Sequence, residues 1–250
     1  MDLHLISKGL AKEGPKAFGE LGGVRMNISP ILISLKTATV AIVITFFLGL
    51  MVAKWVIEIK NEKVKILWDS LLTLPMVLPP TVAGFFLLLI FGVKRPLGLF
   101  FLEYFGVKIA FSWAATVLAA VVISFPLMYR SARGAFEQVD RDLIDAGRTL
   151  GMSEWQVFWK IMLPLALPGV AAGGVLAFAR GLGEFGATAM IAGNIAGKTR
   201  TLPLAIYSMV ASGKLEEAYL YVLILVTLSL LVVAMMNIFA AWGDCYRKRG

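Results

Sequence analysis

The sequence predicts an all-α membrane protein whose core is five membrane-spanning helices, and three observations lead to this prediction. Of the 250 residues, 59% are hydrophobic and 16% are charged, and the mean hydropathy is +0.82. A soluble domain is roughly half apolar and about a quarter charged, so the excess of apolar residues belongs in lipid. The apolar residues also gather into five runs, each near the roughly 20 residues that a helix needs to cross a bilayer.

Each apolar run is predicted to be a helix, because hydrocarbon offers the backbone no hydrogen-bond partner. The first run carries Lys36 near its start and the fourth carries Arg180 and Glu184, whereas the other three contain no charged residue. The apolar stretch 201–212 is too short to span and is predicted to be interfacial or re-entrant. The expected spans are 31–53, 71–92, 109–129, 161–190 and 218–243.

The segments outside the spans offer little chemistry. Residues 1–30 contain no continuous apolar run, so no cleaved signal peptide is expected and the segment is predicted to be extracytoplasmic. The only cysteine is Cys245 and the only histidine is His4, so neither an internal disulfide nor a metal site is predicted. No G-x-x-x-x-G-K-[ST] sequence occurs, so no nucleotide or other cofactor is expected in this chain.

Lysine and arginine set the predicted orientation in the membrane. Loops 54–66 and 130–160 and the tail 244–250 carry more of them than the loops on the other side, although the margin narrows once residues 1–30 are included. The positive-inside rule then places the N-terminus outside and the C-terminus in the cytoplasm of a multi-pass protein of the cytoplasmic membrane. The net charge of +8 is assigned to these flanks, not to a nucleic-acid surface.

The predicted cytoplasmic loop 137–164 has the most specific pattern in the chain. Its first half has apolar residues at helical spacing, and Gly151 can end that helix in the left-handed conformation. A second helix is predicted to start at Ser153, which forms a capping box with Gln156. Two short helices that meet at a glycine predict a rigid apolar knob for a partner outside the membrane. The apolar face of the first helix consists of Val139, Leu143, Ala146 and Leu150.

The spacing in this loop resembles the EAA loop of ABC-importer permeases, which reads EAA-x3-G-x9-I-x-LP. Two positions depart from the pattern, with aspartate for glutamate and glycine for the second alanine. The resemblance implies the five-span core of a type I importer permease, whose loop docks into a groove of a separate ATPase. An ordinary amphipathic loop is the alternative. The matching residues are Asp145, Ala146, Gly147, Gly151, Ile161, Leu163 and Pro164.

Further stretches resemble the permease of molybdate importers, and tungstate and sulfate permeases share much of the pattern. The resemblance covers residues 30–243 and implies a homodimer that imports the oxyanion by alternating access. It also implies two partners, an ATPase subunit that holds ATP and magnesium, and an extracytoplasmic molybdate-binding protein. The chain itself is then not an enzyme. The stretches that carry this resemblance are 74–84, 111–113, 124–128, 177–188, 193–195 and 199–203.

Two groups of residues are candidates for the pathway or a gate. Arg180 and Glu184 are four residues apart on one helix face, and such a pair either lines a pathway or fixes helix packing. A glutamate repels an oxyanion, so Glu184 is expected to pair with Arg180. Pro79, Pro80 and Thr81 either unwind the second span beside a pathway or form a packing kink.

Two other classes of function are the alternatives. An intramembrane enzyme acting on lipids needs converging acids, bases or metal ligands, and the sequence offers few of them. A channel or ion-coupled transporter needs no EAA-like loop. Purification together with an ATPase separates both from the predicted importer subunit.

Overall fold

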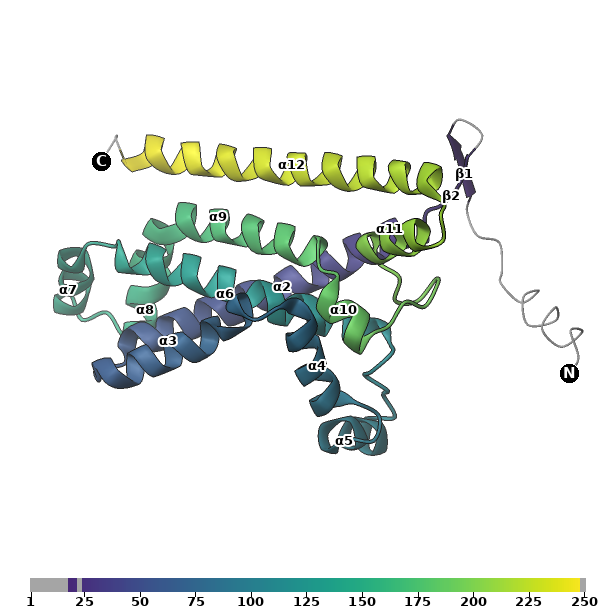
Figure 1. Cartoon of the computed structure of the whole chain (residues 1–250). Coiled ribbons are helices and arrows are strands. Elements are labelled where there is room, and N and C mark those ends of the chain that lie inside the picture. The colour runs from purple at the N-terminus through teal and green to yellow at the C-terminus, as the bar shows by residue number, and fades with distance from the viewer. Residues whose placement is uncertain (1–17, 22–23, 248–250) are drawn as a thin grey trace, which may run out of the picture.

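The computed structural model describes residues 18–21 and 24–247, and the side chains of residues 27–238. A short antiparallel hairpin, β1 (Phe18–Leu21) and β2 (Val24–Asn27), precedes a set of helices (Figure 1). The predictions for His4 and for the side chain of Cys245 lie outside the described residues. The helices are α2 (Ser29–Glu58), α3 (Glu62–Val77), α4 (Pro80–Phe91), α5 (Pro96–Phe105), α6 (Trp113–Glu137), α7 (Arg141–Thr149), α8 (Glu154–Val157), a π-helical turn (Phe158–Met162), α9 (Leu163–Leu182), α10 (Gly186–Ile191), α11 (Leu202–Ala211) and α12 (Leu215–Arg247).

The all-α membrane fold is confirmed. Four helices of the described chain are long and apolar enough to cross a membrane, and α3 with α4 makes a fifth span if this pair, bent by 109°, is counted as one. The helix bounds differ from the predicted spans. The loop predicted at 54–66 is largely helical, α6 continues to Glu137, and α9 ends at Leu182 instead of continuing to residue 190. The predicted short stretch 201–212 forms α11.

Three helices, α2, α6 and α9, form the packed centre of the bundle. Small residues let them approach closely. A Cβ atom on Gly49 of α2 would lie 2.6 Å from Met128 Cγ of α6, and one on Gly173 of α9 would clash with Ser131 of α6. Two hydroxyl pairs join α2 to α6, namely Thr37 with Thr116 at 3.1 Å and Thr45 with Ser124 at 3.3 Å. Buried polar groups are thereby satisfied without water.

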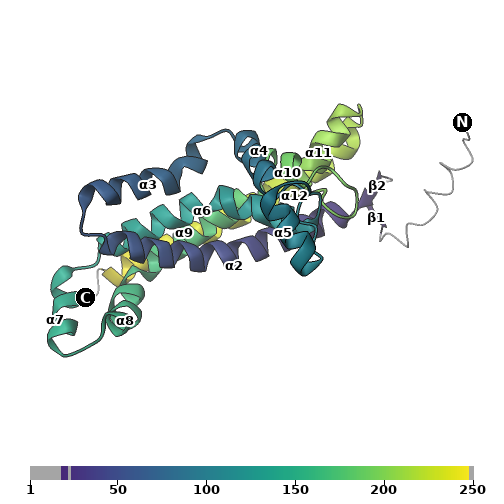
Figure 2. The ribbon, with the colours of Figure 1, turned by 90° about the horizontal axis from the view of Figure 1, so that it is seen from below.

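The remaining helices sit around this centre. Figure 1 shows α7 and α8 at one end of the bundle, beside the C-terminal end of α12, and α11 and the hairpin at the other end. Figure 2 shows α3 standing away from the long helices, and Figure 1 shows α5 below them. Helix α12 packs against α9 and α11, and most of its side chains up to residue 238 are exposed, as expected for a helix that faces lipid or another chain.

Candidate functional site

The predicted knob forms from α7 and α8. Asp140 caps α7 by accepting a hydrogen bond from the backbone N–H of Asp142 at 3.0 Å. Gly151 adopts φ +78° after α7, the left-handed conformation that glycine takes at no steric cost. The capping box starts α8, because Gln156 N donates to Ser153 Oγ at 3.3 Å and Ser153 N donates to Gln156 Oε1 at 3.0 Å. These local signals end α7 and start α8.

Gly147, one of the two departures from the EAA pattern, lies where α7 contacts the π-helical turn that follows α8. A Cβ atom there would lie 2.6 Å from Ile161 Cδ1 and 3.5 Å from Met152 Sδ. Ile161 Cδ1 is the far end of a flexible side chain, so an alanine at 147 needs only a rotation of Ile161. The glycine thus allows α7 to close onto the π-helical turn, and this contact offsets its weak helix propensity.

Arg148 joins the two helices of the knob electrostatically. Its guanidinium donates to Asp145 Oδ1 at 2.9 Å and, through two nitrogens, to both carboxylate oxygens of Glu154 at 2.8 and 3.0 Å. The hydrogen bonds that Arg148 donates to Glu154 and Asp145 raise the pKa of Arg148 above its ordinary value and lower the pKa of Glu154. All three side chains are exposed, so water screens both pairs and their contribution to stability is small.

The apolar face predicted for α7 points outward and does not form the core of the knob. Val139 is buried, but Leu143 and Leu150 are 48% and 82% exposed. Ile144 is the large apolar side chain of α7 that packs inward. The exposed face of Leu143, Ala146 and Leu150 is therefore available to a partner, as the sequence predicts.

The knob is connected to α9 without a break. From Glu154 the chain passes through α8 and the π-helical turn directly into α9, which begins at Leu163 and Pro164. Pro164 lacks an N–H and donates no backbone hydrogen bond to the preceding turn, which is the π-helical one. Phe158 anchors the junction, because it is buried with its ring edge-on to Phe136 of α6 at 5.5 Å between centroids. The knob and α9 are therefore parts of one continuous helical segment.

The chain bends sharply between α3 and α4, where the sequence places Pro79 and Pro80. The angle between the two helices is 109°. Pro80 is the first residue of α4, and Val82 N donates to Pro79 O at 2.8 Å. The prolines therefore form a true break between two helices and not a mild kink within one.

The two groups of predicted pathway residues lie next to each other. Helix α10 packs against α4 so closely that a Cβ atom on Gly186 would lie 3.0 Å from Pro80 Cβ and 3.1 Å from Thr81 N. One turn further, a Cβ atom on Gly84 would lie 2.6 Å from Ala187 Cα. The break at Pro79–Pro80 and the break that precedes α10 thus form one joint.

Arg180, in the last turn of α9, and Glu184, between α9 and α10, lie next to this joint. Arg180 Nη1 donates to Glu184 Oε2 at 3.0 Å, and Ala187 N donates to Glu184 Oε1 at 2.8 Å. The side chain of Glu184 is 2% exposed and that of Arg180 is 34% exposed. Both oxygens of Glu184 are engaged within the chain, and its charge lies at the N-terminal end of α10, where the helix dipole favours an anion. Glu184 fixes the start of α10, which agrees with the expected pairing.

Sequence reasoning missed a polar cluster that ties α3 to α6. Tyr129 OH donates to Asp69 Oδ1 at 2.9 Å, and Arg133 of α6 pairs with both Asp69 and Glu137. Lys65 lies 3.5 Å from Glu137. The spacing of Arg133 and Glu137 along α6 could have indicated their pairing. Nothing in the sequence links Asp69 to Tyr129, 60 residues away.

The most informative findings from known proteins concern transport. A family model described as "Binding-protein-dependent transport system inner membrane component" matches residues 45–242. The molybdenum transport system permease protein ModB of Escherichia coli (strain K12) is 48% identical over 180 residues, which cover 72% of this chain and 78% of that protein. The Haemophilus influenzae protein of the same name is 44% identical over 211 residues, which cover 83% and 92%.

A solved structure shows the same fold. The MetNI methionine ABC transporter in an inward-facing conformation matches with a TM-score of 0.65 at 18% identity, covering 86% of this chain and 95% of that one. The match extends over nearly the whole bundle.

Proposed function

This chain belongs to the family of binding-protein-dependent transport system inner membrane components, and from that premise we propose that it conducts molybdate through an ATP-driven importer. It is a transport subunit of the inner membrane and not an enzyme, so the lipid-modifying alternative is wrong. Relatives at 48% and 44% identity are named for molybdenum transport, which supports molybdate over tungstate or sulfate. The observation that carries the mechanism is the unbroken helical path from the exposed knob into α9.

The knob is the proposed docking site for a separate ATPase, which holds ATP and magnesium. The residues proposed to form this docking site are Asp145, Ala146, Gly147, Gly151, Ile161, Leu163 and Pro164. Its exposed face of Leu143, Ala146 and Leu150 supplies apolar surface for a groove, and Arg148 keeps the two helices together. Because the π-helical turn adds no hinge, movement of the ATPase displaces α9 directly.

The joint between α4, α10 and the end of α9 is the proposed part of the pathway that rearranges. Pro79, Pro80 and Thr81 form the break, and Arg180 with Glu184 fixes its far side. Arg180 keeps a partly exposed positive charge there, which suits an oxyanion, while Glu184 limits how tightly the anion binds. A second copy of the chain completes the pathway, because one bundle of five spans is too small to enclose it.

The proposed topology places the N-terminal segment 1–30 outside and the tail 244–250 in the cytoplasm, with residues 31–243 as the membrane domain. An extracytoplasmic molybdate-binding protein then meets the α11 end and the ATPase meets the α7 end. A membrane-impermeant thiol reagent tests this. Cys245 should react only after permeabilisation, and reaction in intact cells would reverse the orientation.

Uptake into proteoliposomes tests the substrate. The permease is reconstituted with its ATPase and loaded binding protein, and ATP-dependent accumulation of molybdate is measured with tungstate or sulfate as competitor. We expect molybdate uptake that tungstate competes for and sulfate does not. Uptake of sulfate without molybdate would contradict the assignment.

A further inference from the structure

Helices α4 and α5 form an arm that leaves the bundle sideways (Figure 1). Backbone packing fixes the angle between them. Gly98 of α5 is buried against the C-terminal end of α4, where a Cβ atom would clash with the carbonyl of Gly92 and lie 2.7 Å from that of Phe91. Only glycine permits such an approach, so α5 is held rigidly on α4.

Helix α5 is apolar apart from Glu103, and most of its side chains are exposed. At 10 residues it is about 15 Å long at 1.5 Å per residue, which is too short to span a bilayer. Tyr104 is 75% and Phe105 is 64% exposed, and Phe101 is only half-buried. The other exposed large side chains are Leu97, Leu99, Phe100 and Leu102. Water is a poor environment for this helix, so something apolar covers it.

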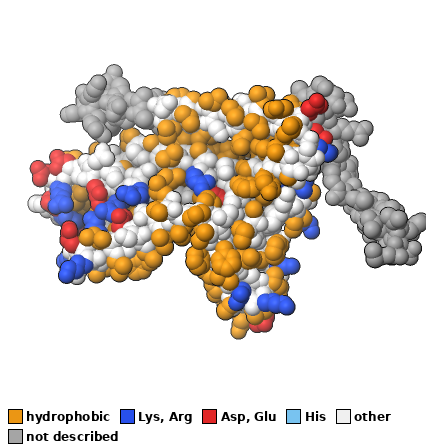
Figure 3. Space-filling view, in the orientation of Figure 1, with side chains coloured by type: hydrophobic (Ala, Val, Ile, Leu, Met, Phe, Trp, Pro, Cys, Tyr) orange, Lys and Arg blue, Asp and Glu red, His pale blue; other side chains and the backbone are white. Residues whose placement is uncertain are grey.

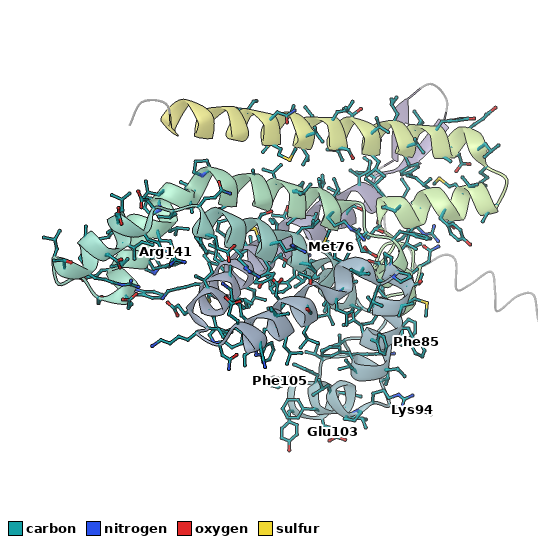
Figure 4. All side chains as sticks on the ribbon, turned by 60° about the vertical axis from the view of Figure 1, so that its left-hand side comes forward. Met76, Phe85, Lys94, Glu103, Phe105 and Arg141 are labelled. Atoms are coloured by element: carbon teal, nitrogen blue, oxygen red, sulfur yellow. The ribbon has the colours of Figure 1, made fainter. Side chains whose placement is uncertain are left out.

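Charged residues flank α5 and are mostly basic. Lys94 and Arg95 precede the helix and Lys108 follows it, all three exposed and without an ion pair in the described part of the chain. Glu103 is the one acidic residue of the helix. Figure 3 shows charged side chains at the tip of the arm and hydrophobic ones between the tip and the bundle. Figure 4 shows Lys94, Glu103 and Phe105 at that tip.

The level of α5 along the bundle fits a membrane surface. In Figure 1, α5 lies at the level of α10, towards the α11 end and away from α7. Aromatic side chains and lysine or arginine are the residues that settle where headgroups meet acyl chains. If the arm met its counterpart in a second copy, the basic flanks would face like charges. An anionic headgroup complements both features at once.

We propose that α5 is an interfacial anchor that binds anionic phospholipid headgroups of the outer leaflet. Lys94, Arg95 and Lys108 contact the phosphates, and Tyr104 and Phe105 enter the boundary below them. The proposal rests on the proposed function only for the side of the membrane on which α5 lies. Because α5 is fixed on α4, the anchor also sets the position of the joint at Pro79–Pro80.

Lipid quenching locates α5 in the bilayer. In the full-length Cys245→Ser protein, Tyr104→Cys carries an environment-sensitive fluorophore, and vesicles contain lipids with a spin label at the headgroup or deep in the acyl chain. We expect stronger quenching from the headgroup label. The matched control, Val226→Cys in the exposed middle of α12, should be quenched most by the deep label. A fluorophore at 104 that no lipid quenches would mean that protein covers α5, and deeper quenching would exclude the interface; either result overturns the proposal.

Lipid retention tests the headgroup contact. Lys94→Gln/Arg95→Gln/Lys108→Gln is purified in nanodiscs of phosphatidylglycerol and phosphatidylcholine, and the bound lipids are counted by mass spectrometry. Each neutralised residue should weaken retention of the anionic lipid about fivefold. The control Lys198→Gln/Lys214→Gln removes exposed lysines from other predicted outer loops and should change retention little. Equal retention by the triple variant and wild type would overturn the proposal. Neither measurement depends on transport, so both can be interpreted even if the chain does not transport molybdate.

Discussion

The two ends of α9 are built in opposite ways. At the α7 end the helix continues into the knob without interruption, and the charged cluster there, Arg148 with Asp145 and Glu154, is exposed. At the other end α9 stops, three residues intervene before α10, and the pair of Arg180 and Glu184 is largely buried. A continuous helix passes on a displacement, whereas a break between closely packed helices lets two segments take separate positions. The end of α9 that faces the proposed ATPase is thus continuous, and the end beside the proposed pathway is broken.

The largest effect should come from Glu184→Ala, which removes the polar centre of the joint. It leaves the Arg180 charge and the Ala187 N–H without their acceptor, and loss of one partner of a buried pair costs about 3–5 kcal/mol. Arg180→Ala leaves the buried Glu184 carboxylate without its counter-charge, so we expect a loss of similar size. Thermal unfolding of the purified permease ranks the two variants. Stabilities equal to wild type would show that the pair is not buried.

The double variant Arg180→Ala/Glu184→Ala separates packing from gating. Removing both charges should recover part of the stability lost in Glu184→Ala, since no uncompensated charge is left. Molybdate uptake by the assembled double variant then decides the role of the pair. Uptake at the wild-type rate would make the pair structural, and assembly without uptake would assign it to the pathway.

Gly84→Ala tests the joint through packing alone. The new Cβ atom would lie 2.6 Å from Ala187 Cα, which is backbone and cannot turn away, so we expect a loss of about 1–3 kcal/mol. Gly134→Ala is the matched control in a helix of the centre, where a Cβ atom meets nothing within 4 Å. It should be neutral or stabilising by up to about 1 kcal/mol. Equal melting temperatures of the two variants would contradict the close contact.

At the stiff end, Gly151→Glu should uncouple transport while the bundle stays intact. A side chain in the left-handed conformation costs roughly 1–2 kcal/mol, and no neighbour lies within 4 Å of the added Cβ, so the strain is confined to the knob. We expect ATP hydrolysis that no longer responds to loaded binding protein. Gly151→Asn, which tolerates this conformation, is the control. Normal uptake by Gly151→Glu would reject the docking role.

Arg148→Ala should have the smallest effect on stability. Arg148 and its partners are exposed, so we expect only a small drop in melting temperature, which salt reduces further. Melting temperatures at low and high ionic strength measure it. A loss as large as that of Glu184→Ala would remove the contrast between the two ends of α9.

The features that the sequence predicted correctly depend on neighbours along the chain. Gly151, the capping box of Ser153 with Gln156, and the break at Pro79–Pro80 each act within a few residues, and each is present in the structure. Hydropathy predicted the spans for the same reason, because a spanning helix satisfies its backbone hydrogen bonds within its own segment.

The features that it missed require two distant segments to meet. Tyr129 and Asp69 are far apart in the chain, and the contact of Gly84 with Ala187 joins two helices whose packing no periodicity encodes. The bridge from Arg148 to Glu154 crosses a turn at a spacing that is not helical. The predicted end of the fourth span at residue 190 is wrong for a related reason. Hydropathy does not distinguish a continuous helix from one that ends at Leu182 and starts again at Gly186.

The lengths of α9 and α12 determine which bilayer thickness each helix can match. With 20 residues, α9 is about 30 Å long, equal to the usual hydrocarbon thickness, whereas the 33 residues of α12 reach about 50 Å. A long helix accommodates thinner or thicker bilayers by tilting or by extending into the headgroups. Helix α9 has no such reserve, because the knob continues from one end and the break before α10 follows the other. Of these two helices, α9 therefore sets the tighter limit on the bilayer thickness that the subunit can match.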